Sequence, residues 1–205
     1  MGVDPEKRAT LRRFAAVGAA SPLATFSEGA AAESDGSTPE SGTRDAIAGY
    51  VTATPGAHFS KLRDDLKLGT GEAQYHLRKL SEGGVVEVHR DGDYKRFYPA
   101  GRFSGFEQVA LGYLRRETAR GLIIELLQNP GASGTTLASA LDVSRATVSR
   151  YAKELDAAGL LSREDGYSVE EPETLITLLL RYADSFDEAT AAFASDASSM
   201  LRYDP

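Results

Sequence analysis

The stretch AQYHLRKLSEGGVVEVHRDGDYKRFY, residues 73–98, decides the fold. Its first part places apolar side chains at helical spacing and ends at Gly83-Gly84, a pair suited to ending a helix. Its second part alternates apolar and polar residues around Asp91-Gly92, a strong turn signal for a β-hairpin. We therefore predict a helix over 70–82 and then a hairpin with strands over 85–90 and 93–98.

The register of this hairpin follows from its predicted turn. With Asp91-Gly92 as the two turn residues, Glu87 lies opposite Arg96, and Val86 lies opposite Phe97. Both cross-strand pairs are favourable, which supports the register.

The same pattern recurs 75 residues further along the chain without a gap. Pro55-Gly56 aligns with Pro130-Gly131, and Gly84-Val85-Val86 aligns with Gly159-Leu160-Leu161. Because the matched positions are apolar and turn positions, we expect the two copies to share a fold. Each copy predicts three helices and then a hairpin, the second around Asp165-Gly166. The helices are predicted at 43–53, 60–67 and 70–82 in the first copy, and at 117–128, 135–141 and 145–158 in the second.

Three helices followed by a hairpin make a winged helix-turn-helix. The predicted fold class is therefore mainly α with small β-hairpin wings: two tandem winged helix-turn-helix modules plus N-terminal and C-terminal helices. We predict an N-terminal helix within 1–26, a flexible linker over 27–42, module 1 over 43–103, a connecting helix over 104–116 that runs into module 2, module 2 over 117–170, and a C-terminal helix within 171–205.

The N-terminal segment admits two interpretations. Asp4-Pro5 suits a helix start, and Leu11 and Phe14 follow at helical spacing before Pro22. This pattern is typical of a helix that docks on the body of the protein. Arg12-Arg13, followed by a mildly apolar stretch, resembles a weak twin-arginine export signal.

Composition excludes several classes of site. The 205 residues contain no Cys, so the chain has no disulfide, thiol nucleophile or cysteine zinc site. The three His residues have no second ligand at metal spacing, and no apolar run is long enough to span a bilayer. No catalytic motif is recognisable. We therefore predict a cytoplasmic protein that is not an enzyme and needs no metal or cofactor.

Charge is unevenly distributed along the chain, whose net charge is −7. Residues 43–103 carry 10 basic and 8 acidic side chains, whereas residues 104–205 carry 9 basic and 16 acidic ones. A locally positive block can bind a polyanion even when the whole protein is negative.

The motif Tyr75-His76-Leu77-x-x-Leu80, with the wing sequence Lys95-Arg96-Phe97-Tyr98-Pro99, resembles archaeal winged helix-turn-helix transcriptional regulators of the broad ArsR/MarR-like type. The second half, with Ser144-Arg145-Ala146-Thr147-Val148-Ser149-Arg150-Tyr151, is similar to another module of the same superfamily. The resemblance implies a transcriptional regulator that binds double-stranded DNA.

Candidate DNA-contacting residues lie on the predicted helix 70–82 and on the first wing. On a helical projection, Ala73, Leu77 and Leu80 face the core and a polar face points outward. A recognition helix presents such side chains to base edges, and a wing contacts phosphate or the minor groove. A solvated face without a ligand is the alternative. The candidates are Gly71, Gln74, Tyr75, Arg78 and Lys79 on the helix, and Arg90, Lys95 and Arg96 on the wing.

In module 2 the candidates are Arg145, Ser149, Arg150 and Lys153. Two acids at the tip of its wing, Glu164 and Asp165, would repel phosphate. This module either binds DNA by its helix alone or serves as a scaffold for dimerisation.

The C-terminal segment repeats apolar residues at heptad-like spacing. We predict one helix that either packs on its own module or forms a homodimer interface. The candidate dimerisation residues are Leu175, Leu179, Tyr182, Phe186 and Phe193.

The leading functional hypothesis is a sequence-specific transcriptional regulator that reads DNA with the recognition helix and wing of module 1. The competing hypothesis is a winged-helix protein-interaction scaffold in the transcription machinery, without base-specific reading of DNA. Salt dependence of DNA binding separates the two.

Overall fold

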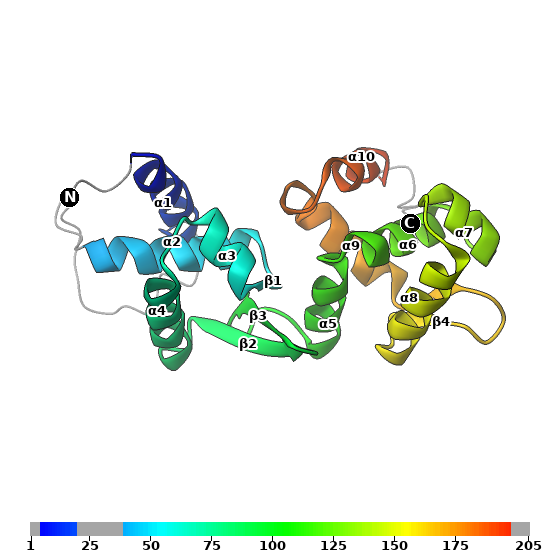
Figure 1. Ribbon diagram of the computed structural model, residues 1–205, viewed down its shortest axis with the longest axis horizontal. Coiled ribbons are helices and arrows are strands. Elements are labelled where there is room, and N and C mark those ends of the chain that lie inside the picture. The colour runs from blue at the N-terminus through cyan, green and yellow to red at the C-terminus, as the bar shows by residue number, and fades with distance from the viewer. Residues whose placement is uncertain (1–4, 20–38, 198–205) are drawn as a thin grey trace, which may run out of the picture. The chain divides into compact units, whose positions relative to one another are not determined.

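The computed structural model describes residues 5–19 and 39–197, and the chain divides into two compact units between Ser104 and Gly105 (Figure 1). Both are winged helices, so the predicted mainly α fold with small β-hairpin wings is confirmed.

Unit 1 begins with two helices and ends with a hairpin. The predicted helices 43–53, 60–67 and 70–82 correspond to α2, α3 and α4. Strand order is β1-β3-β2, and both pairings are antiparallel. The elements are α1 Pro5–Ala19, α2 Pro39–Ala53, β1 Ala57–His58, α3 Phe59–Asp65, α4 Thr70–Glu82, β2 Val86–Asp91 and β3 Tyr94–Pro99.

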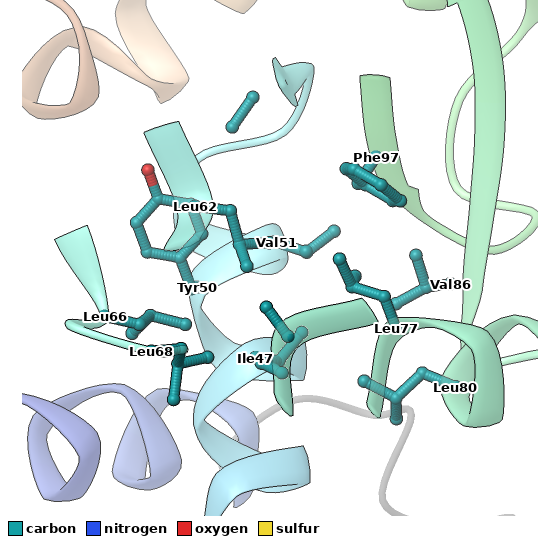
Figure 2. Packing of buried hydrophobic residues seen from close by; sticks show 12 residues of the cluster. Ile47, Tyr50, Val51, Leu62, Leu66, Leu68, Leu77, Leu80, Val86 and Phe97 are labelled. Atoms are coloured by element: carbon teal, nitrogen blue, oxygen red, sulfur yellow. The ribbon is translucent and has the colours of Figure 1, made fainter. Parts of the chain in front are cut away.

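The core of unit 1 gathers apolar side chains from every element of the winged helix (Figure 2). Ile47 of α2 and Leu62 of α3 are fully buried, and Leu77 and Leu80 of α4 are 4% and 7% exposed. The base of the wing adds Val86 and Phe97. Burial of this shared apolar surface therefore joins α4 and the wing to the body of the unit.

Helix α1 docks on this core, as the first interpretation of the N-terminal segment expected. Leu11 and Phe14 pack against the core cluster, and the Phe14 ring meets the Tyr50 ring edge-on at 5.1 Å between centroids. The predicted linker 27–42 is partly wrong, because α2 begins at Pro39, a residue suited to the first helical turn. The rest of that linker, 27–38, lies outside the described residues.

Unit 2 repeats the winged helix and adds helices at both ends. The predicted helices 117–128, 135–141 and 145–158 correspond to α6, α7 and α8. The elements are α5 Gly105–Leu114, α6 Glu117–Gln128, α7 Gly134–Ala140, α8 Arg145–Ala157, β4 Leu161–Ser162, β5 Ser168–Val169, α9 Pro172–Arg181, the 3-10 turn η2 Ala183–Ser185 and α10 Glu188–Asp196.

The duplication extends to the way helices end. In α4 the Gly84 N–H donates to Ser81 O and the Val85 N–H donates to Leu80 O, at 3.1 and 2.9 Å. These two bonds define a Schellman motif, which needs a left-handed residue at Gly84. Gly159 ends α8 with the same two bonds, and the φ angles of the two glycines are 68° and 70°.

The turn inside each helix-turn-helix uses the same motif without glycine. Lys67 follows α3 with φ 53°, and Asp142 follows α7 with φ 50°. The residues after them, Leu68 and Val143, donate back to Arg63 O and Ala138 O at 2.9 and 3.0 Å. Positions 75 residues apart thus share backbone geometry as well as side-chain type.

The first wing is a two-residue hairpin, but its predicted register is wrong. Val88, not Val86, lies opposite Phe97, and Asp91 pairs with Tyr94, so Gly92 and Asp93 form the turn. Gly92 has φ 58°, and glycine at the first turn position suits a type II′ hairpin. The shift of two residues leaves every side chain on its predicted face.

The connecting helix 104–116 does not run on into module 2. Helix α5 ends at Leu114, and Arg116 adopts an extended backbone, φ −98° and ψ 117°, as the N-cap of α6. The break is held by Arg115, whose guanidinium donates to Ser185 O at 2.7 Å.

The C-terminal segment is not one helix, so its heptad-like seam is interrupted. Asp187 starts a new helix, because its carboxylate accepts a hydrogen bond from the Thr190 N–H at 2.9 Å and forms an ion pair with Arg120. Burial raises the pKa of Asp187, but hydrogen bonds from Thr190 and Arg120 prevail and lower it below its ordinary value.

The five candidate dimerisation residues pack within unit 2. Leu175 and Leu179 are fully buried, and Tyr182 and Phe193 are 7% and 3% exposed. Phe186 lies against the guanidinium of Arg115, 4.2 Å from its ring centroid. Packing within one chain accounts for these side chains, and homodimerisation through them stays a prediction.

His58 connects α3 to the wing. Its Nδ1 accepts a hydrogen bond from the Lys61 N–H at 3.2 Å, which caps α3, and its ring lies 5.5 Å from that of Tyr94. Burial, followed by the charges of Arg96 and Lys61, lowers the pKa of His58. A protonated Nδ1 could not accept this bond, so the neutral ring stabilises the fold.

We expect Gly84→Ala and Gly159→Ala each to reduce the free energy of unfolding by about 1 kcal/mol, because alanine is strained at positive φ. No atom lies within 4 Å of a Cβ added at either glycine, so the cost is conformational. Urea denaturation measures it. Gly105→Ala is the control, since its added Cβ also meets open space and its φ is not positive. An equal loss in the control would contradict the assignment.

We also expect a pH-dependent contribution from His58. Because its folded pKa lies below the unfolded value of about 6.5, its contribution to stability is present above that pH and is lost as pH falls through the folded pKa. His58→Asn keeps a capping acceptor that does not titrate. As the pH is lowered from above 6.5 to below the folded pKa of His58, the free energy of unfolding should therefore fall more steeply in the wild type than in the variant. Parallel pH profiles would show that His58 is not responsible.

Candidate nucleic-acid interface

Helix α4 is positioned so that one face is buried and the other is free. The Gly69 N–H donates to Glu72 Oε2 at 3.3 Å at its start, and the Schellman motif at Gly84 ends it. Ala73, Leu77 and Leu80 face the core, as predicted. The opposite face is open to solvent, and the predicted residues Gly71, Gln74, Tyr75, Arg78 and Lys79 are all exposed on it.

His76 lies beside the buried stripe of α4 and is itself a packing residue. It is 5% exposed and meets the Tyr75 ring edge-on at 5.1 Å between centroids. Its Nδ1 is buried and has no hydrogen-bond partner in the described part of the chain.

Arg78 and Lys79 of α4 form only weak, exposed ion pairs with Glu82. Glu82 Oε2 lies 3.0 Å from Lys79 Nζ, whereas Glu82 Oε1 lies 3.9 Å from Arg78 Nε. The Arg78 side chain is 66% exposed. Exposed ion pairs of this kind contribute about 0–1 kcal/mol, so an anionic ligand can replace Glu82 at little cost.

One face of the wing changes from apolar to cationic along its length. Val86 is buried at its base, Val88 is 43% exposed, and Arg90 is exposed near the turn. Arg90 pairs directly across the hairpin with Lys95, which is also exposed. Like charges opposite each other on a sheet are destabilising, so this pair marks a place where an anion would relieve repulsion.

The prediction that Arg96 contacts DNA from the wing is wrong, because its side chain is buried. It is 3% exposed and lies on the other face of the hairpin, next to β1. Its Nε donates to Asp91 Oδ2 at 2.5 Å, and its Nη1 donates to Gly56 O at 2.9 Å. Both partners and the burial hold the guanidinium inside the unit, so Arg96 positions the wing instead of reaching a ligand.

A groove of about 500 Å³ separates α4 from the wing. Phe59, Leu77, Val88 and Phe97 supply its apolar lining, and both elements contribute polar side chains to it. The polar lining residues are Gln74, Arg78 and Ser81 from α4 and Lys95 from the wing. The structure thus brings Gln74, Arg78 and Lys95 to one concave surface. The other exposed candidates of unit 1 do not line this groove: Gly71, Tyr75, Lys79 and Arg90.

Tyr94 is a surface residue that sequence reasoning missed as a candidate. It is 54% exposed near the hairpin turn, and its ring lies beside His58. An exposed aromatic flanked by Asp93 and Lys95 is the signal that could have identified it.

The corresponding face of unit 2 is also exposed. All four predicted residues, Arg145, Ser149, Arg150 and Lys153, are on the surface of α8. Arg150 Nη1 lies 3.0 Å from Glu154 Oε1, and Glu154 also pairs with Arg116 at 3.4 Å. Glu164 and Asp165 are exposed in the loop between β4 and β5, as the sequence predicted.

Among the described residues, no helix is both long and apolar enough to cross a lipid bilayer. Within residues 5–19 and 39–197, no group of three or more His, Asp or Glu side chains is arranged to hold a metal ion.

Comparison with known proteins matches the two winged helices separately. A family model described as an N-terminal HTH domain matches residues 41–111, and one described as an HTH domain matches residues 120–168. An uncharacterized HTH-type transcriptional regulator of Methanocaldococcus jannaschii is 29% identical over 125 residues, which cover 60% of this chain and 31% of that protein. The chain therefore spans about a third of the length of that relative. No solved structure matches the chain. With each helix-turn-helix match falling on one winged helix of the fold, the chain is a tandem winged helix-turn-helix protein, similar to an archaeal transcriptional regulator.

Proposed function

We propose that this chain is a sequence-specific regulator of transcription that binds double-stranded DNA through α4 and the wing of unit 1. The observation that carries the proposal is that Lys95 of the wing lines one groove with Gln74 and Arg78 of α4, and that the exposed Arg90 lies directly across the hairpin from Lys95. A helix flanked by a cationic hairpin fits a major groove bordered by phosphates.

The residues divide into two roles. Gln74 and Arg78 are the base readers, because an amide can bridge adenine and a guanidinium can fork onto guanine. Tyr75 packs on a thymine methyl or donates to phosphate. Lys79, Arg90 and Lys95 neutralise phosphates, which supplies affinity without sequence information.

The acidic balance of the whole chain does not oppose this proposal. In residues 43–103 the 10 basic side chains outnumber the 8 acidic ones. Electrostatic attraction is local, because salt screens exposed charges beyond about 10 Å. Unit 2 offers α8 as a second cationic helix, with a wing loop whose two acids would repel phosphate. It either contacts DNA by that helix alone or serves as a scaffold.

The second candidate function is a protein-interaction scaffold in the transcription machinery. The acidic loop of unit 2 is the specific observation that favours it. Salt separates the two functions, since a DNA complex weakens steeply as salt rises. Non-enzymatic action and cytoplasmic location remain part of the proposal.

We expect Arg78→Ala to weaken operator binding by about 1–3 kcal/mol and to relax specificity at one base position. Lys95→Ala should weaken binding to all DNA sequences by a similar factor, because it removes a phosphate contact. Gel-shift titrations on a duplex enriched in genome-wide mapping of bound DNA measure both effects. Arg102→Ala is the matched control, since Arg102 is exposed but lies outside α4 and the wing. Unchanged binding in Arg78→Ala and Lys95→Ala together would remove this surface from consideration.

Gly71→Ala should separate stability from binding. Gly71 lies within α4, and a Cβ there meets open space, so alanine should stabilise the helix by about 0.5–1 kcal/mol. In the DNA complex the same methyl group would obstruct close approach of the backbone. Thermal unfolding should therefore shift upward while the gel-shift affinity falls. A variant that is more stable and binds as tightly as the wild type would place Gly71 outside the interface.

A further inference from the structure

Two ion pairs attach α1 to the helix-turn-helix of unit 1. Lys7 Nζ lies 3.0 Å from Glu72 Oε2 near the start of α4, and Lys67 Nζ, in the turn before α4, lies 2.5 Å from Glu6 Oε2. Together with the Phe14–Tyr50 ring contact, they hold the first turns of α1 beside the N-terminal end of α4. This is the end of a recognition helix that contacts base edges.

Helix α1 and the wing lie on opposite flanks of the exposed face of α4. In a helix that advances about 100° per residue, Gln74 and Ser81 project to one side of that face, and Glu72 and Lys79 project to the other. Gln74 and Ser81 line the groove shared with the wing. Glu72, on the far flank, is the residue that Lys7 of α1 contacts.

The exposed surface of α1 includes two arginines, Arg8 and Arg12. Neither forms an ion pair with any residue in the described part of the chain. They are four residues apart, so they share one stripe of the helix, where like charges destabilise it. As with Arg90 and Lys95 on the wing, an anion at this stripe would relieve the repulsion.

The geometry points to α1 as a second phosphate-contacting element: Arg8 and Arg12 bind the DNA backbone on the side of α4 opposite the wing. This inference rests on the proposed function of unit 1. A helix in the major groove has one sugar-phosphate strand on each side, and the groove is about 12 Å wide. The wing meets one strand, and α1 supplies the cations for the other.

The test is the salt dependence of DNA binding by the full chain. Fluorescence anisotropy of a labelled duplex of mixed sequence gives the slope of log affinity against log salt, from about 50 to 200 mM. We expect the slope to become shallower by about 0.9 in Arg8→Gln and by about 1.8 in the double variant Arg8→Gln, Arg12→Gln, one phosphate for each arginine. Circular dichroism melts check that the variants fold.

The control is the double variant Arg102→Gln, Arg181→Gln, which removes two exposed arginines outside α1 and should keep the wild-type slope. If the wild type binds DNA and the α1 variants keep its slope, the role of α1 is overturned, and the proposed function of α4 and the wing is not affected. An equal change in the control would also overturn the role of α1, because net charge would then explain the effect. A wild type without measurable DNA binding would instead refute the proposed function.

Discussion

The orientation of α4, and therefore which of its faces is exposed, depends on the burial of three side chains on its inner face. Ala73, Leu77 and Leu80 pack into the core of unit 1, and the exposed side of the helix follows from their spacing. Since burial of a leucine side chain contributes about 1.5–3 kcal/mol, rotation of α4 about its axis would cost more than the weak ion pairs of its outer face could return. Recognition of DNA, which has a regular surface, needs polar side chains that a rigid helix holds in a fixed outward orientation.

A buried guanidinium plays the corresponding part for the wing. Arg96 pairs with the Asp91 carboxylate within the hairpin, near its turn, and donates to the Gly56 carbonyl outside it, so this guanidinium ties the hairpin to the body of unit 1. Removing one partner from a buried ion pair leaves an uncompensated charge, which makes such a pair a strong positional constraint. With Arg96 buried, Arg90 and Lys95 are the exposed cations of the wing.

The internal repeat supplies the same scaffold twice, with matching left-handed positions at Lys67 and Asp142 and at Gly84 and Gly159. The charged residues placed on the two scaffolds differ.

Much of this arrangement can be predicted from sequence, because apolar periodicity and turn residues determine it locally. Helices α4 and α6 have the bounds that their patterns predict, and the inner face of α4 contains the expected residues. The role of Arg96 could not be predicted, because it depends on a two-residue strand, β1, and on which pair of residues forms the hairpin turn. Asp91-Gly92 and Gly92-Asp93 are both reasonable turns, and only packing of the strands selects between them. The break before α10 had a local signal in Asp187, a good N-cap residue, but the apolar spacing that continues through it predicted a single helix.

Hydrogen–deuterium exchange of the full chain, with and without a bound DNA duplex, tests the central claim most directly. The account predicts that DNA slows exchange chiefly in the backbone of α4 and in the β2–β3 hairpin of unit 1. Binding that protects residues 105–197 and leaves 70–82 and 86–99 unchanged would contradict it.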